Sequence, residues 1–198
     1  MEQNEKIGKY TVQSQIRLGG RTIAFGVNEA EEYPYMVTYV REQSGFFQTE
    51  EGTAYQSYVD AMEDLQGRIQ TQLAVIRQEM RQAPTLEAFP SDKMLPLSGN
   101  CTGKVLCLKP SVLAPEYRYA SHQLIYAERG SGCQETGGRS IHTFNLHDGS
   151  SSTWYRQDFI GEVPVENLPE WAQEGLAKIP ERIRQRNEKL NHKHREEK

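Results

Sequence analysis

The sequence predicts an α+β fold, in which a small antiparallel sheet with one long helix is followed by a small bent β-barrel-like module with C-terminal helices. Three observations predict it. Apolar and polar residues alternate between Lys9 and Arg41, as they do in half-buried strands. Apolar residues then recur at steps of three and four from Tyr55 to Met80, as on one face of a helix. After residue 103, short apolar runs return with glycines between them, which is typical of a small barrel or a strongly bent sheet.

The first module is predicted to span residues 1–83. KYTVQSQIRLGG and RTIAFGV are predicted to be two strands of a hairpin, because Gly19-Gly20 is a two-residue turn signal. YPYMVTYV, rich in aromatic and β-branched residues, is the third strand. QSGFFQTEEG is expected to lead into the helix, with Gly52 ending the preceding strand and Thr53 as the N-cap. The apolar stripe of the helix consists of Tyr55, Tyr58, Met62, Leu65, Ile69, Leu73, Ile76 and Met80.

A linker is predicted at residues 84–103, because APTLEAFPSDKMLPLSGNCTG contains three prolines, two glycines and no hydrophobic period. The second module is predicted to span residues 104–177, with strands in KVLCLKP, HQLIYAE, RSIHTFNL and STWYRQDFIGEV. In KVLCLKP, alternation places Val105 and Cys107 on one face and Leu106 and Leu108 on the other.

A helix is predicted to cap the second module. Pro169 suits the first turn of this helix, and Trp171 is expected to be buried against the sheet. Pro180 ends or kinks the helix. Residues 178–198 then form a basic helical tail, in which eight Lys/Arg stand against four Glu, so that this end carries +4 and the remainder −8. Such a tail is either a nucleic-acid contact or a solvated helix end.

The composition is that of a folded chain with an acidic balance. The 198 residues are 36% apolar and include ten Tyr, six Phe and two Trp, which argues against disorder. The net charge of −4 argues against a protein that binds nucleic acid over its whole surface.

The sequence also indicates a compartment. The three cysteines, Cys101, Cys107 and Cys133, are odd in number and their spacing fits no disulfide scaffold. The segment MEQNEKIGKY has no apolar run, so no signal peptide is expected. No stretch approaches the roughly 18 apolar residues that span a bilayer. We therefore expect a cytoplasmic protein with reduced thiols and no membrane partner.

Two kinds of ligand site are weakly indicated. GSGCQETGG has no GxGxxG or GKS/T motif, so it is expected to be a hairpin loop rather than a phosphate cradle. No closely spaced pair of the CxxC or HxxxH type is present. We therefore expect no metal and no cofactor. The residues considered as metal ligands are Cys101, Cys107, Cys133, His122, His142 and His147.

An enzymatic alternative stays open. The sequence contains the residue types of a nucleophile, a base and an orienting acid. These are Cys133 as the nucleophile, His122 or His142 as the base, and Asp148 or Asp158 as the acid. No nucleophile-elbow or protease-like signature surrounds them. In this alternative the chain acts on a small or nucleotide substrate through Cys133, His122 and His142.

A binding face is the remaining signal, since aromatic and basic residues interleave in PEYRYASHQLIYAER and STWYRQDF. Exposed aromatic rings beside arginines form stacking surfaces for single-stranded nucleic acid. The alternative is that Trp154 and Tyr155 divide between core and surface. The candidate residues for binding nucleic acid or another partner are Arg118, Tyr119, Arg129, Arg139, Trp154, Tyr155, Arg156, Arg182, Arg184 and Arg186.

The second half also resembles a known group of domains. The motifs that carry the likeness are Glu116-Tyr117-Arg118, Gln123-Leu124, Gly130 to Gly132, Gly138-Arg139, Asp148-Gly149, Arg156 to Gly161 and Leu168 to Ala172. They resemble small uncharacterised accessory domains of conjugative elements and phages of gut bacteria, found alone or inside large helicase- and methyltransferase-bearing proteins. Residues 9–80 resemble a companion module more loosely.

The resemblance implies a non-enzymatic accessory or binding module of a mobile genetic element. It brings no catalytic residue with it. Its partner would be a protein or a weakly bound single-stranded nucleic acid. A third interpretation is an acidic decoy that occupies a host DNA-binding defence protein, which the −8 body favours only slightly.

Overall fold

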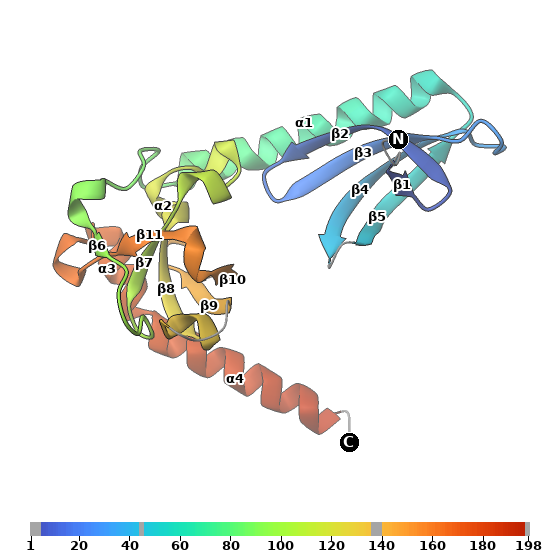
Figure 1. The fold of residues 1–198 in the computed structure, drawn as a ribbon. Coiled ribbons are helices and arrows are strands. Elements are labelled where there is room, and N and C mark those ends of the chain that lie inside the picture. Colours follow the sequence, from blue (N-terminus) through green and yellow to red (C-terminus); the bar gives the residue numbers. More distant parts are fainter. Residues whose placement is uncertain (1–4, 44–45, 136–139, 197–198) are drawn as a thin grey trace. The chain divides into compact units, whose positions relative to one another are not determined.

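The computed structural model describes residues 5–43, 46–135 and 140–196 (Figure 1). The chain forms two compact units, Met1–Gln82 and Ala83–Lys198. The fold is α+β, as the sequence predicts. The first unit is a curled antiparallel sheet of five strands with one long helix, and the second is a further sheet with C-terminal helices.

The first sheet has its strands in chain order. Leu18 pairs with Arg21 across Gly19-Gly20, which confirms the predicted hairpin, and Gly19 has the positive φ of 59° that this turn requires. The strands are β1 (Lys6–Ile7), β2 (Tyr10–Leu18), β3 (Arg21–Val27), β4 (Tyr35–Gln43) and β5 (Phe46–Tyr55).

The predicted start of the helix is wrong. Thr53 lies in β5, where it pairs with Val37, and helix α1 (Tyr58–Gln82) begins later. The segment looks like a helix entry because it is polar and contains glycine, but strand β4 offers it an edge with which its backbone can pair. The register shift beside Glu51, whose φ is 54°, marks a bulge. Ser57 is the residue that caps α1, since its Oγ accepts the Asp60 amide at 3.3 Å.

Helix α1 covers one face of this sheet (Figure 1). Met62, Leu65 and Ile69 pack against a buried cluster that includes Phe25 and Val37, so this part of the predicted apolar stripe is confirmed as the packing face. The Tyr58 ring at the helix start lies edge-on to Phe25, with ring centroids 6.0 Å apart.

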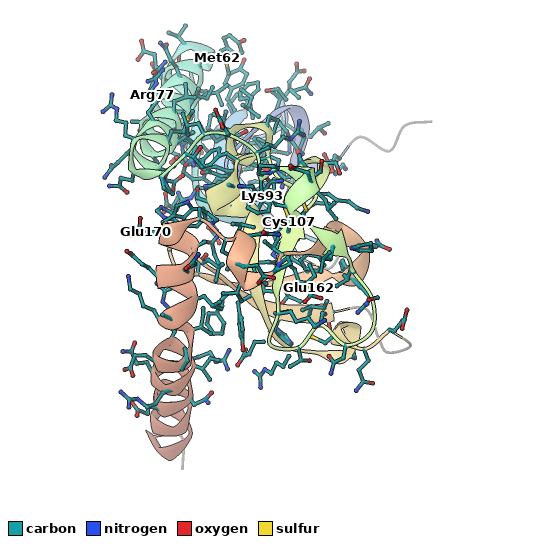
Figure 2. The ribbon with its side chains drawn as sticks, turned by 90° about the vertical axis from the view of Figure 1, so that its left-hand side faces the viewer. Met62, Arg77, Lys93, Cys107, Glu162 and Glu170 are labelled. Carbon is teal, nitrogen blue, oxygen red and sulfur yellow. The ribbon has the colours of Figure 1, made fainter. Side chains whose placement is uncertain are left out.

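The second sheet has the order β10-β9-β8-β7-β11-β6, and neighbouring strands are antiparallel. Its strands are β6 (Leu95–Pro96), β7 (Val105–Leu108), β8 (Leu124–Arg129), β9 (Ser140–Asn145), β10 (Ser151–Tyr155) and β11 (Phe159–Glu162). Figure 2 shows Cys107 within this sheet and Glu162 on the adjacent strand β11.

The central strand β7 confirms the predicted alternation. Val105 and Cys107 belong to one buried cluster, whereas Leu106 and Leu108 belong to another. The sheet is therefore buried on both faces at its centre, because helices cover the first face and loops cover the second.

Helices and 3₁₀ turns connect and cap the strands of the second unit. The α-helices are α2 (Ala120–Gln123), α3 (Glu170–Ala177) and α4 (Ile179–Glu196). The 3₁₀ turns are Ser91–Lys93, Pro110–Val112, Pro115–Tyr117, Ser131–Cys133, Arg156–Asp158 and Val165–Asn167. Pro180 is the second residue of α4, which confirms that it separates two helices. None of the described helices combines the length and the apolar character of a bilayer span.

Trp171 is half-buried rather than buried as predicted. It packs against the cluster that contains Phe89 and Leu168. Its remaining surface lines a groove of about 370 Å³, whose rim includes Glu87 and Lys93. The ring anchors α3, but it also faces solvent.

Residues of the predicted linker pack into the second unit. Phe89 is buried, and Leu95–Pro96 pairs with β11. The buried Gln123 side chain accepts the Phe89 amide at 2.8 Å and donates to the Leu108 carbonyl at 3.1 Å. This one side chain ties the segment to the central strand.

Candidate functional site

Three exposed side chains form a row across β8, β9 and β10. Arg129 pairs with His142, and His142 pairs with Thr153, so the three share one face of the sheet. Thr153 Oγ1 lies 3.0 Å from His142 Nδ1, which confirms that the side chains meet. Tyr155 follows two residues after Thr153, on the same face, and is 52% exposed. We call Arg129, His142, Thr153 and Tyr155 the basic row.

A carboxylate lies beside this row. The register shifts between Ala127 and Arg129, and the extra residue at this bulge is Glu128. Its two oxygens accept hydrogen bonds from both Nη atoms of Arg186, at 2.6 and 2.5 Å. These bonds lower the pKa of Glu128, and the charges of Arg129 and His142 lower it further. The carboxylate is therefore ionised at neutral pH.

Arg129 holds this carboxylate only loosely. Its Nε lies 3.8 Å from Glu128 Oε2, which is beyond hydrogen-bonding distance, and its side chain is 63% exposed. Because Arg186 occupies both Glu128 oxygens, the Arg129 guanidinium can bind an external anion without losing a strong internal bond.

The predicted arginines of the tail differ in their roles. Arg186 is held by Glu128, and its guanidinium also lies 5.2 Å from the centroid of the Phe144 ring. Arg182 donates to the Asn145 carbonyl at 3.4 Å. Arg184 faces solvent, where it pairs with Glu181 of the same helix. At least the first part of α4 is thus joined to the second sheet rather than extending as a free tail.

Two of the predicted binding residues belong to the opposite face of this sheet. Trp154 packs against the cluster that contains Leu106 and Leu108. Arg156 is half-buried and donates to the carbonyl of Gly99 at 2.9 Å and to that of Cys133 at 3.1 Å. Arg156 therefore joins two loops of the core, and it is not part of the basic row.

The remaining predicted residues are separate from the row. Tyr119 is only 4% exposed, so its ring cannot stack on a base. Arg118 is exposed and donates to the Leu113 carbonyl at 3.2 Å. Arg139 lies outside the described residues. Of the ten predicted residues, the structure groups Arg129 and Tyr155 in the row, with Arg186 beside it.

The structure does not bring together the residues of the enzymatic alternative. Cys133 is buried in the cluster that contains Ile141, whereas the neighbouring His142 points to the other face of β9. His122 stacks on Tyr117, with ring centroids 4.4 Å apart, and its Nε2 lies 3.2 Å from the Tyr119 hydroxyl. Among the described residues, no group of three or more His, Cys, Asp or Glu side chains is placed to hold a metal ion.

Sequence reasoning missed three members of this region. The sequence predicts His142 only as a metal ligand or a base, and it indicates no role for Thr153 or Glu128. The alternation of STWY could have placed Thr153 on the face of Tyr155. The pairing of Thr153 and Arg129 with His142 depends on strand register, for which the sequence carries no local signal.

Comparison of the chain with protein-family models, curated proteins and solved structures gives no match. The resemblance to domains of mobile elements thus remains a prediction from motifs.

Proposed function

We propose that this chain is a non-enzymatic accessory module of a bacterial mobile genetic element, which acts in the cytoplasm and binds single-stranded nucleic acid weakly. The observation that carries the proposal is the basic row. It places an exposed guanidinium, an imidazole and an exposed phenol ring on one face of β8–β10.

The row has the chemistry that a single strand requires. Arg129 supplies a cation for a phosphate, and each phosphate neutralised contributes about 0.7 to the salt slope of single-strand binding. The exposed Tyr155 ring supplies a stacking surface, worth about 1–3 kcal/mol per base. Thr153 and His142 supply polar groups between them. Because the net charge of the chain is −4, the chain as a whole does not attract nucleic acid, and we expect a low affinity.

The test is a fluorescence titration with single- and double-stranded oligonucleotides at two salt concentrations. Arg129→Gln should weaken binding and lower the salt slope by about 0.7. Arg118→Gln is the matched control, because Arg118 is also exposed but lies outside the row. Point variants are preferable to removal of the tail, since Ile179 at the start of α4 is buried.

A second pair of variants, both at exposed tyrosines, tests the stacking contribution. Tyr155→Ala should weaken binding to single strands, whereas Tyr33→Ala, which removes an exposed tyrosine ring of the first unit, should not. Absence of binding by the unmodified chain at low salt would refute the nucleic-acid proposal. Equal losses in all four variants would show that the row has no special role.

A protein partner is the second candidate, and the edge of β10 favours it. This strand lies at one end of the sheet order, and among the described residues none pairs with its outer edge. Since Asn145 N donates to Ser150 O, alternation turns the backbone of Ser151 and Thr153 outward. An extended segment could pair with this edge, where its side chains would lie next to Thr153 and Tyr155 of the basic row.

Strand addition at this edge is tested by titrating the protein with a peptide of alternating Val and Glu. The amide chemical shifts of the protein are the readout. Shifts confined to β10 that disappear in Ser151→Pro, which removes an outward amide, would support strand addition. A peptide that leaves the β10 amides unshifted would rule this candidate out.

A further inference from the structure

Two cysteines lie side by side in the core of the second unit. The Cys101 amide donates to the Cys133 carbonyl at 2.9 Å, and both residues belong to the same buried cluster. Both residues are free thiols and are at most 1% exposed. This backbone hydrogen bond holds the two residues close together, and a disulfide needs a Cα separation of roughly 4.4–6.8 Å.

The chain around each cysteine is fixed by the same side chain. Arg156 donates to the Gly99 carbonyl on the Cys101 side and to the carbonyl of Cys133 itself. Its Nη1 also lies 3.8 Å from Cys101 Sγ. This guanidinium therefore holds together the two loops that carry Cys101 and Cys133, which are 32 positions apart in the sequence.

The third cysteine provides an internal comparison. Cys107 is equally buried, but it lies in the other cluster of this unit, and its Sγ donates to the Leu108 carbonyl at 3.7 Å. Burial raises the pKa of the Cys107 thiol to about 12. All three cysteines are thus buried, whereas Cys101 and Cys133 also share one cluster and a backbone hydrogen bond.

We propose that Cys101 and Cys133 are a redox modification site and form an intramolecular disulfide when the protein meets a low-molecular-weight disulfide. One protein thiol loses its proton and attacks the small disulfide, which releases one small thiol and leaves a mixed disulfide on the protein. The second protein thiol then loses its proton and attacks the protein-bound sulfur, so that the intramolecular S–S bond forms and the second small thiol leaves. Two protein thiols are oxidised and one small disulfide is reduced.

The first step is slow in the folded state. Burial raises the pKa of Cys101 to about 11, so little thiolate is present at neutral pH, although the Arg156 charge opposes this effect. The oxidant must also enter a closed core, which requires a local opening of the loop that carries Cys101 or of the turn Ser131–Cys133. The disulfide, once formed, closes this loop and should raise the melting temperature.

The test uses the intact chain and oxidised glutathione. After equilibration with excess oxidant, the protein is denatured, its remaining thiols are alkylated, and peptides are identified by mass spectrometry. We expect one alkylated cysteine, Cys107, and a linked peptide pair containing Cys101 and Cys133. The melting temperature should rise on oxidation and return with dithiothreitol.

Single variants separate this outcome from general unfolding. Cys107→Ala should still form the disulfide, whereas Cys101→Ala and Cys133→Ala should form none and lose the oxidant-dependent rise in melting temperature. Three free thiols after equilibration would overturn the proposal. So would glutathione on Cys107 at a rate equal to that of disulfide formation, because it would show that only the unfolded chain reacts.

Discussion

Arg186 on α4 binds Glu128 on β8 with both of its Nη atoms, at 2.6 and 2.5 Å from the two carboxylate oxygens. The side chains are 26% and 10% exposed, so the pair is shielded from solvent although it is not fully buried. It joins helix α4 to the second sheet.

Loss of this pair should destabilise the protein. We expect Arg186→Gln to lower the free energy of unfolding by about 2 kcal/mol, because it leaves the shielded carboxylate without its partner and removes the contact with Phe144. Arg184→Gln is the matched control, since it breaks an exposed pair of the same helix, and should change stability by less than about 0.5 kcal/mol. Urea denaturation measures both, and equal effects would contradict the prediction.

The same pair should make stability depend on pH. The folded state lowers the pKa of Glu128 below its usual value of 4.5, chiefly through the hydrogen bonds from Arg186. The stabilisation is therefore complete above the unfolded-state pKa and is lost as the pH falls through the folded-state value. Denaturation of the wild type and of Glu128→Gln from pH 7 to pH 3 checks this. Their difference should shrink only at the acidic end, and a constant difference would be inconsistent with it.

Gln123→Leu should destabilise the second unit strongly. The side chain of Gln123 is 1% exposed, and its loss leaves the Phe89 amide and the Leu108 carbonyl without partners in the core. We expect a loss of about 2–4 kcal/mol in unfolding free energy. A melting curve of the variant tests this, and protection of the Phe89 amide from hydrogen exchange should fall with it. An unchanged Phe89 amide would show that the bond does not hold this segment.

Ser121→Ala, in contrast, should not destabilise the protein. Ser121 Oγ is buried, and it has no hydrogen-bond partner among the described residues. Removing it takes away an unsatisfied polar atom and leaves a void smaller than a water molecule, so stability should stay level or rise by about 1 kcal/mol. Thermal unfolding measures the change. A loss of more than about 1 kcal/mol would reveal a partner for this hydroxyl.

Two helical glycines should respond differently to alanine. Gly67 lies in α1 with open space where a Cβ would lie, so Gly67→Ala should stabilise by about 1 kcal/mol. At Gly175 in α3, a Cβ would lie 1.9 Å from the Leu146 carbonyl oxygen, so Gly175→Ala must displace the helix from the sheet. We expect a large fall in melting temperature for this second variant alone. Similar melting temperatures would mean that α3 is not held at this contact.

Structural elements that are determined by a few adjacent residues could be predicted from the sequence alone. The alternation of Val105 to Leu108 predicted both faces of β7, the glycine pair predicted the first hairpin, and Pro180 predicted the break between α3 and α4. Each depends on the backbone preferences or side-chain period of a few adjacent residues. The α+β class followed from these elements.

Contacts between distant segments depended on the tertiary fold. It placed Thr53 in a strand because β4 has an edge to pair with, and it aligned Arg129, His142 and Thr153 through the register of three strands. It also brought Arg186 to Glu128 across 58 residues. Such contacts arise from long-range backbone pairing and from packing of whole elements, and no local pattern of residues encodes either.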